Sequence, residues 1–368
     1  MNKYFDNGST SYPKPKKVAE DIYDYIVNLG GTYGRAAYER VIKCTSMVES
    51  CRDKVAQIIG ASDGANIFWC QNATMGSNTV LNSLNLEGKR VLISPMEHNA
   101  ITRPLHHLNV EWEVMPCFDD GFVDVEKLNQ ISKDNLSLII VNHQSNVNGI
   151  IQPIEEICKW AGDTEVMVDT SQSLGHINID VEKNNIDYLI FTGHKGLLGV
   201  SGIGGYYSKN PRKMKPLIYG GTGTSSESYS MPNSYPDTQE AGTPNMVGIV
   251  GLNSAIENRP KSQHTKKEVF DFLVELKKIK GLRVLCANDF KNQGELLSFY
   301  STEISGSEFV LRLNRDFGIE CRYGVHCAPL AHRTLKTLEL GTIRVAFSPY
   351  HTHEDLEYLL QSIKKALI

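Results

Sequence analysis

Short apolar runs alternate with amphipathic helical patterns along the chain from about residue 15 to residue 250. Residues 151–161 (IQPIEEICKWA) have the spacing of an amphipathic helix, with Pro153 near its first turn, where proline is favoured. The runs with the strongest strand character are residues 90–94, 136–142, 165–169 and 187–192. Nearly continuous apolar strands separated by helices are typical of a mostly parallel sheet that is covered on both faces.

The pattern changes after about residue 250. A lysine-rich stretch at 265–280 predicts a helix, and a second helical pattern closes the chain. Three apolar stretches in this part predict strands, at residues 308–314, 318–322 and 342–347. We therefore predict an α/β fold with two domains, a large one of residues 15–250 and a small α+β one of residues 251–368.

Composition and charge narrow the choice of function. With 368 residues and a net charge of −4, the chain lacks the basic surplus of most nucleic-acid binders. No apolar run approaches the roughly 20 residues that span a bilayer, and the first residues contain no apolar signal core. We expect a cytoplasmic protein that binds neither nucleic acid nor membrane. The eight cysteines form no C-x-x-C pair, so we expect no metal site and mostly core cysteines.

Polar side chains follow four of the predicted strands. They are His98, Asn146, Asp169 and Thr192, with His194 and Lys195 two and three residues after Thr192. In sheets of this kind ligands bind at the carboxyl ends of the strands. One such residue would mean little, but four strand ends together predict one pocket.

Lys195 and Asp169 form the most informative pair. Lys195 lies in G-H-K-G, where small neighbours leave room for a planar cofactor and a desolvated amine can form a Schiff base with an aldehyde. Asp169, one strand away, would keep the ring nitrogen of pyridoxal 5′-phosphate (PLP) protonated, so that the ring accepts electrons. Opposite charges about 4 Å apart attract by roughly 4 kcal/mol at an effective dielectric of about 20. Considered alone, Lys195 would be a solvated loop lysine and Asp169 a helix N-cap.

The segment Asn72-Ala73-Thr74 is typical of a turn that enters a helix. The free amides and the dipole of a helix N-terminus favour an anion such as a phosphate. An ordinary helix cap accounts for this segment equally well.

Seven short blocks, taken in their order along the chain, resemble the class V aminotransferase family. Within it the chain is most similar to the cysteine desulfurases and selenocysteine lyases, above all to group II desulfurases, whose hallmark is R-x-G-x-H-C-A. The blocks are N-A-T (72–74), M-E-H-N-A (96–100), S-N-V-N-G (145–149), V-D-T-S-Q (168–172), F-T-G-H-K (191–195), E-A-G-T-P-N (240–245) and R-Y-G-V-H-C-A-P (322–329).

This resemblance implies the fold type I of PLP-dependent transferases and a set of cofactor contacts. Lys195 would bind the cofactor covalently, Asp169 would pair with the pyridine nitrogen, and His98 would stack on the ring and assist proton transfer. Gln172 and Asn146 would approach the phenolic oxygen. The phosphate would be held by Ala73, Thr74, Thr192 and His194.

The same resemblance implies a homodimer and a substrate site. Thr243 would reach the phosphate of the neighbouring subunit, so that both active sites are shared. Arg344, in G-T-I-R-V-A-F, would grip the substrate carboxylate, and Arg322 and Asn7 would line the substrate side, with Asn146 near both ligands. Residues 1–14 would pack near the active site.

Cys327 is the predicted nucleophile. Locally, it follows Arg322 and His326, and such cations lower the pKa of a thiol and favour the reactive thiolate. The resemblance implies a desulfurase that converts cysteine to alanine and leaves a persulfide on Cys327 for an acceptor protein. A selenocysteine lyase, another PLP lyase or aminotransferase, and a scaffold of the same fold remain alternatives.

The chain departs from the family pattern at three places that bear on acceptor docking and substrate preference. At one of them, the G-G-G of the family's phosphate side is replaced by G-G-T-G at residues 220–223. The loop after Lys195 reads G-L-L-G-V-S-G, and the segment 258–265 (NRPKSQHT) is shorter and more polar than the linker helix that the family leads us to expect.

Overall fold

The computed structural model describes residues 1–34 and 36–368, and its larger sheet has seven strands in the order β1-β7-β6-β5-β4-β2-β3. The strands β2 to β6 run parallel to one another, whereas β7 is antiparallel to both of its neighbours, β6 and β1. The four predicted strands are confirmed as β2, β4, β5 and β6. The bounds are β1 Ile67–Cys70, β2 Arg90–Ile93, β3 Glu111–Val114, β4 Leu136–Asn142, β5 Glu165–Asp169, β6 Tyr188–Thr192 and β7 Gly204–Ser208.

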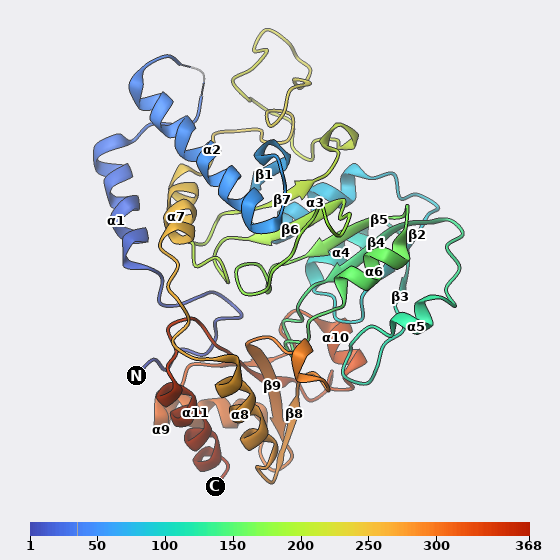
Figure 1. The fold of residues 1–368 in the computed structure, drawn as a ribbon, viewed down its shortest axis with the longest axis vertical. Coiled ribbons are helices and arrows are strands. Elements are labelled where there is room, and N and C mark those ends of the chain that lie inside the picture. Colours follow the sequence, from blue (N-terminus) through green and yellow to red (C-terminus); the bar gives the residue numbers. More distant parts are fainter. Residues whose placement is uncertain (35) are drawn as a thin grey trace.

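Helices cover both faces of this sheet (Figure 1). Along β4, Ile139 and Val141 face one core, with α2, α6 and α7, and Leu138 and Ile140 face the other, with α3 and α4. This alternation is the period of two expected of a strand, and it confirms the predicted α/β fold. The helices of this part are α1 Lys16–Asp24, α2 Glu39–Ile59, α3 Ala73–Ser83, α4 Asn99–His107, α5 Val125–Leu128, α6 Ile154–Ala161 and α7 Met246–Glu257.

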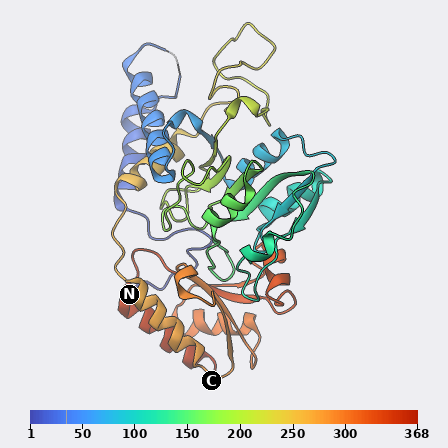
Figure 2. The same cartoon turned by 45° about the vertical axis from the view of Figure 1, so that its right-hand side comes forward.

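A second, antiparallel sheet of four strands lies toward the end of the molecule that holds both termini (Figures 1 and 2). Its order is β10-β11-β9-β8, and it packs with three helices around a separate apolar core. The domain limits at residues 250 and 251 stay a prediction; α7 crosses them and packs against α1 and α2. The elements are α8 Lys266–Lys277, β8 Leu282–Leu285, β9 Leu296–Ser301, α9 Gly306–Phe317, β10 Arg322–Gly324, α10 Pro329–Thr334, β11 Thr342–Ala346 and α11 His353–Ala366.

Two of the strands predicted in this part are wrong. Residues 308–314 belong to α9, in which Phe309 and Leu313 are buried one helical turn apart and the Ser305 hydroxyl accepts a hydrogen bond from the N–H of Glu308. The apolar run is too short for its spacing to distinguish a helix from a strand, which is why the strand prediction failed. Residues 318–322 are mostly connection, because Gly318 ends α9 in a left-handed conformation (φ 69°).

The N-terminal segment joins the two parts of the molecule. Asp6 bridges to Ala346 of β11, Phe5 lies in the core of the second sheet, and the N–H of Ser11 donates to the carbonyl of His194 (2.9 Å). Residues from opposite ends of the sequence therefore meet beside Lys195. Among the described residues no helix is both long enough and apolar enough to cross a membrane.

Candidate active site

The predicted polar residues gather at one edge of the large sheet, where its parallel strands end. Asp169 is the last residue of β5 and Thr192 the last residue of β6. His98 follows β2 in the sequence and is the N-cap of α4, and Asn146 follows β4. The strand ends thus meet as the sequence predicts.

Lys195 lies in the turn after β6 and is half-buried. Burial, reinforced by the charge of Arg344, lowers the pKa of its amine to about 8, although Asp169, Asp6 and Cys327 act in the opposite direction. Among the described residues, the amine of Lys195 has no hydrogen-bond acceptor. An amine that loses its proton near neutral pH and lacks a partner is poised for covalent chemistry.

Asp169 is a carboxylate with only 3% of its surface exposed. Its Oδ1 accepts hydrogen bonds from the N–H (2.8 Å) and the hydroxyl (2.5 Å) of Ser171. Within the described part of the chain it takes part in no ion pair. Because a buried charge is costly unless it is paired, the geometry calls for a cationic ligand group.

Several donors and acceptors beside Lys195 are unused. The hydroxyl of Thr192 and Nδ1 of His194 are buried without a hydrogen-bond partner in the described structure. The Asn72 side chain caps α3 by accepting from the N–H of Met75 (3.0 Å). The amides of Ala73 and Thr74 open that helix, where N–H groups lack intrahelical partners and favour an anion.

His98 is half-buried and held in one tautomer. Its Nδ1 accepts a hydrogen bond from the N–H of Ala100 (3.0 Å), so a neutral ring carries its proton on Nε2. Burial, together with the charge of Lys195, lowers the pKa of His98 to about 4. The ring is therefore neutral at physiological pH.

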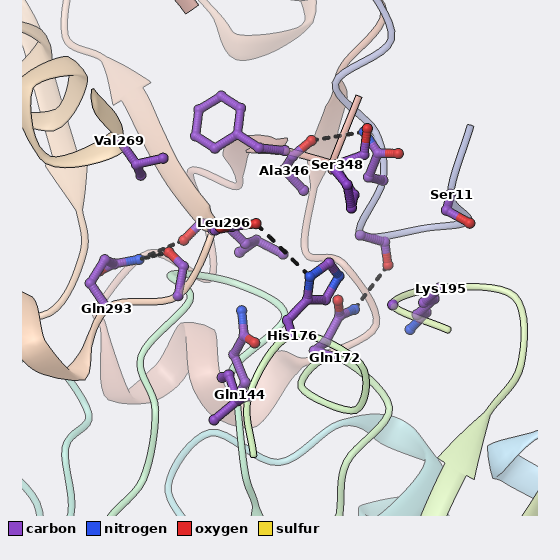
Figure 3. A pocket seen from close by; sticks show the side chains of 18 of the residues that line it. Ser11, Gln144, Gln172, His176, Lys195, Val269, Gln293, Leu296, Ala346 and Ser348 are labelled. Atoms are coloured by element: carbon purple, nitrogen blue, oxygen red, sulfur yellow. Dashed lines mark hydrogen bonds and ion pairs between the residues drawn. The ribbon is translucent and has the colours of Figure 1, made fainter. Parts of the chain in front are cut away.

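Two side-chain amides stand near this edge. Asn146 donates from Nδ2 to the carbonyl of His326 (2.7 Å), and its buried Oδ1 has no partner in the described structure. Gln172 donates from Nε2 to the carbonyl of Gly8 (2.9 Å). Figure 3 shows Gln172 beside Lys195 in a pocket that also contains Gln144.

Arg344 is almost fully buried in β11 and already has partners. Its Nη2 donates to Asp6 (2.8 Å) and to the hydroxyl of Ser9 (2.8 Å), and Nη1 donates to the carbonyl of Asn146 (3.2 Å), which leaves Nε free. Arg322, opposite Arg344 on β10, is exposed and also contacts Ser9. The ion pair with Asp6 was not predicted, because nothing in the sequence links residues 338 positions apart.

Two further predicted residues have different surroundings: Asn7 lines the pocket that Lys195 also lines, and Thr243 lies outside that pocket. The amide of Asn7 is engaged within the fold, donating to the carbonyls of Tyr4 and Ala346 (both 3.0 Å). Thr243 is exposed ahead of α7 and lines a groove with Met75. Its contact with a neighbouring subunit stays a prediction.

Cys327 differs from the other seven cysteines, which are buried or half-buried, because it is exposed. It lies in the loop between β10 and α10 with a left-handed backbone (φ 56°). Its carbonyl accepts from the N–H of Asn99 (2.8 Å), which ties the loop to the start of α4 beside His98.

The predicted role of His326 as a cation beside this thiol is wrong. Its ring is buried and faces Thr342, with Nε2 3.0 Å from both the carbonyl and the hydroxyl of that residue. Burial and the nearby charge of Arg344 lower the pKa of His326, so the ring is neutral. Of the two cations that were invoked for Cys327, Arg322 remains.

Comparison with known proteins identifies the family from nearly the whole length of the chain. The class-V aminotransferase family matches residues 3–359. The chain belongs to this family. A probable cysteine desulfurase of Methanothermobacter thermautotrophicus is 30% identical to this class-V aminotransferase over 98% of the chain and 94% of the relative. The cysteine desulfurase CsdA of Escherichia coli is 29% identical over 99% of the chain and 94% of the relative.

Two solved structures superpose on this class-V aminotransferase over nearly its whole length. A cysteine desulfurase of Thermococcus onnurineus superposes with a TM-score of 0.89 at 28% identity, covering 98% of this chain and 94% of the other. The structure of Escherichia coli CsdA superposes with a TM-score of 0.86 at 28% identity, covering 99% and 94%.

The side chains of this class-V aminotransferase fit PLP. A buried, unpaired carboxylate at Asp169 suits a pyridinium, and the free amine of Lys195 suits an aldehyde. The unused groups of Thr192 and His194, next to the start of α3, suit a phosphate. Sequence reasoning overlooked Glu97, which lies fully buried in the M-E-H-N-A block.

Proposed function

We propose that this protein is a PLP-dependent cysteine desulfurase, which converts L-cysteine to L-alanine and leaves a persulfide on Cys327. One observation carries the proposal. Cys327 is an exposed thiol whose loop is bound to the start of α4, next to His98. The relatives named as cysteine desulfurases support the same reaction.

The residues at the strand ends would hold the cofactor. Lys195 would bind it covalently, Asp169 would pair with its ring nitrogen, and the phosphate would lie against Thr192, His194 and the start of α3. When bound, PLP accepts the electron pair of a breaking Cα–H bond of an amino acid. This chemistry requires a negatively charged partner for the ring nitrogen, and Asp169 would supply it.

Lys195 would move the substrate proton. An amine with a pKa of about 8 is partly deprotonated near neutral pH, so it can take a proton from Cα and return one later. His98, neutral and with its proton on Nε2, can donate a hydrogen bond toward the same space but carries no charge there.

Arg344 and Cys327 would act on the substrate itself. The unpartnered Nε of Arg344 offers a donor to a carboxylate, with Arg322 as an exposed second cation. The sulfur of Cys327 bonds to the substrate sulfur while the Cβ–S bond breaks, so cysteine and one thiol become alanine and one persulfide without an external oxidant. Because Cys327 is exposed, an acceptor protein's thiol can collect the outer sulfur by exchange.

The experiment compares Cys327→Ser with wild type and with Cys286→Ser, a half-buried cysteine, as the matched control. Each protein receives cysteine or selenocysteine, and alanine, sulfide and selenide are measured. We expect Cys327→Ser to bind PLP normally and to release almost no sulfide from cysteine, since the thiolate is the nucleophile. The Cys286→Ser control should match wild type.

Two further results decide between the candidate functions. Wild type treated with cysteine should gain one sulfur atom on the peptide that contains Cys327, and dithiothreitol should remove it. Sulfide release from Cys327→Ser at the wild-type rate would make the chain a general PLP lyase. Rapid turnover of selenocysteine with no turnover of cysteine would make it a selenocysteine lyase.

A further inference from the structure

Three consecutive carbonyls around Lys195 each accept a hydrogen bond from a different part of the chain. The carbonyl of His194 accepts from the N–H (2.9 Å) and the hydroxyl (3.1 Å) of Ser11, in the N-terminal segment. The carbonyl of Lys195 accepts from the N–H of Leu198 (2.9 Å) within the turn itself. The carbonyl of Gly196 accepts from Nη1 of Arg259. Figure 3 shows the Ser11 segment beside the turn that contains Lys195.

Arg259 reaches this turn from the connection between α7 and α8. It belongs to the polar segment 258–265, at which the chain departs from the family pattern. Among the described residues it takes part in no ion pair, and its one hydrogen-bond acceptor is the carbonyl of Gly196. Burial lowers the pKa of Arg259, against the attraction of Glu295. Placing a guanidinium in a half-buried position without a carboxylate partner costs free energy, so this contact is unusual for a connecting segment.

The segment around Gly175 leaves room for the contact between Arg259 and Gly196. Gly175 has a left-handed backbone (φ 92°), and a Cβ at that position would lie 2.5 Å from the carbonyl oxygen of Gly196 and 2.9 Å from Nη1 of Arg259. Any other residue at position 175 would therefore separate the guanidinium from its acceptor or displace the turn.

We infer that Arg259 is a positioning residue for Lys195, and this inference rests on the proposed role of Lys195 as the residue that binds PLP. The guanidinium holds the Gly196–Leu197 peptide, one residue past Lys195, while Ser11 holds the His194–Lys195 peptide on its N-terminal side. With the turn held on both sides of Lys195, the backbone of Lys195 has one orientation, and its amine is directed toward the strand ends. The connecting segment 258–265 thus places the reactive amine.

The test measures how fast the amine captures the cofactor. Cofactor-free wild type, Arg259→Ala and Arg259→Gln are mixed with PLP, and the visible absorption band is followed over time; Lys261→Ala, an exposed residue of the same segment, is the matched control. We expect capture to slow about 10- to 100-fold in both Arg259 variants, as misplacing a reactive group by about 1 Å does. Lys261→Ala should capture PLP at the wild-type rate.

Guanidinium ion supplies the readout that a purely structural role would not move. Added at concentrations far below those that unfold the protein, it should restore much of the capture rate of Arg259→Ala and leave wild type unchanged. Glutamine is too short to reach Gly196, so Arg259→Gln carries the test by the same rate criterion if the alanine variant does not fold.

The outcomes separate this inference from the proposed function. If wild type itself gains no visible band, the role of Lys195 is wrong. If wild type gains the band and a folded Arg259 variant captures PLP equally fast, Arg259 does not position Lys195. Slow capture by Arg259→Ala that guanidinium does not improve at all would also overturn the inference.

Discussion

Replacing Glu97 with glutamine should stabilise the protein at neutral pH and leave its stability nearly unchanged in acid. The side chain of Glu97 has no exposed surface. Its Oε1 accepts a hydrogen bond from the hydroxyl of Ser94 (2.7 Å), and its Oε2 has no partner in the described structure. Burial raises the pKa of Glu97 to about 8, against the bond from Ser94 and with help from the nearby charge of Asp169. Glu97 is therefore a neutral acid beneath the site.

The magnitude follows from the difference between the folded and unfolded pKa values. A rise from 4.5 to about 8 corresponds to about 5 kcal/mol between the two protonation states. Below the unfolded value, both states of the protein hold the proton and nothing is lost. As pH rises toward the folded value, the unfolded chain releases the proton first, so stability falls by about 1.4 kcal/mol per pH unit. Between about pH 5 and pH 7 the loss is about 2.7 kcal/mol.

The assay is denaturant unfolding of wild type and Glu97→Gln at a series of pH values, both freed of cofactor because a cation beside Asp169 would alter the pKa of Glu97. Glutamine keeps the size and one acceptor of the neutral acid but cannot ionise. The difference in free energy of unfolding should therefore be small near about pH 4.5 and grow in favour of Glu97→Gln as pH rises. A difference that stays constant over this range would show that Glu97 is ionised in the folded protein, and the reasoning would fail.

The other predictions concern the cofactor and the assembly. Wild type should be yellow with PLP, and Lys195→Ala should lose the band of the covalently bound cofactor; a wild type that stays colourless with added PLP would refute the cofactor assignment. Asp169→Asn should retain part of its cofactor but lose most of its kcat, because a neutral ring nitrogen is a poorer electron acceptor; unchanged kcat would remove Asp169 from the site. Mixing Lys195→Ala chains with Thr243→Ala chains should restore some activity in heterodimers, whereas a fully active monomer would contradict shared active sites.

The local pattern of the sequence was sufficient for four strands of the large sheet, β2, β4, β5 and β6, and for the polar groups at their carboxyl ends. Apolar runs such as residues 136–142 form strands because their side chains enter cores on both faces. The carboxyl ends of parallel strands meet at one edge, so Asp169 and Thr192 had to lie near Lys195 once those strands were recognised. Local spacing failed at residues 308–314, where an apolar run too short to distinguish strand from helix belongs to α9.

Only the tertiary structure decided which charges exist in the site and what holds them. The side chain of His326 stands one residue from Cys327 in the sequence, yet burial against Thr342 makes it neutral. Arg344 pairs with Asp6, and Arg259 holds the carbonyl of Gly196, through contacts between segments far apart in the chain. Protonation depends on desolvation and on neighbours brought by folding, and neither quantity is encoded in the spacing of residues along the sequence.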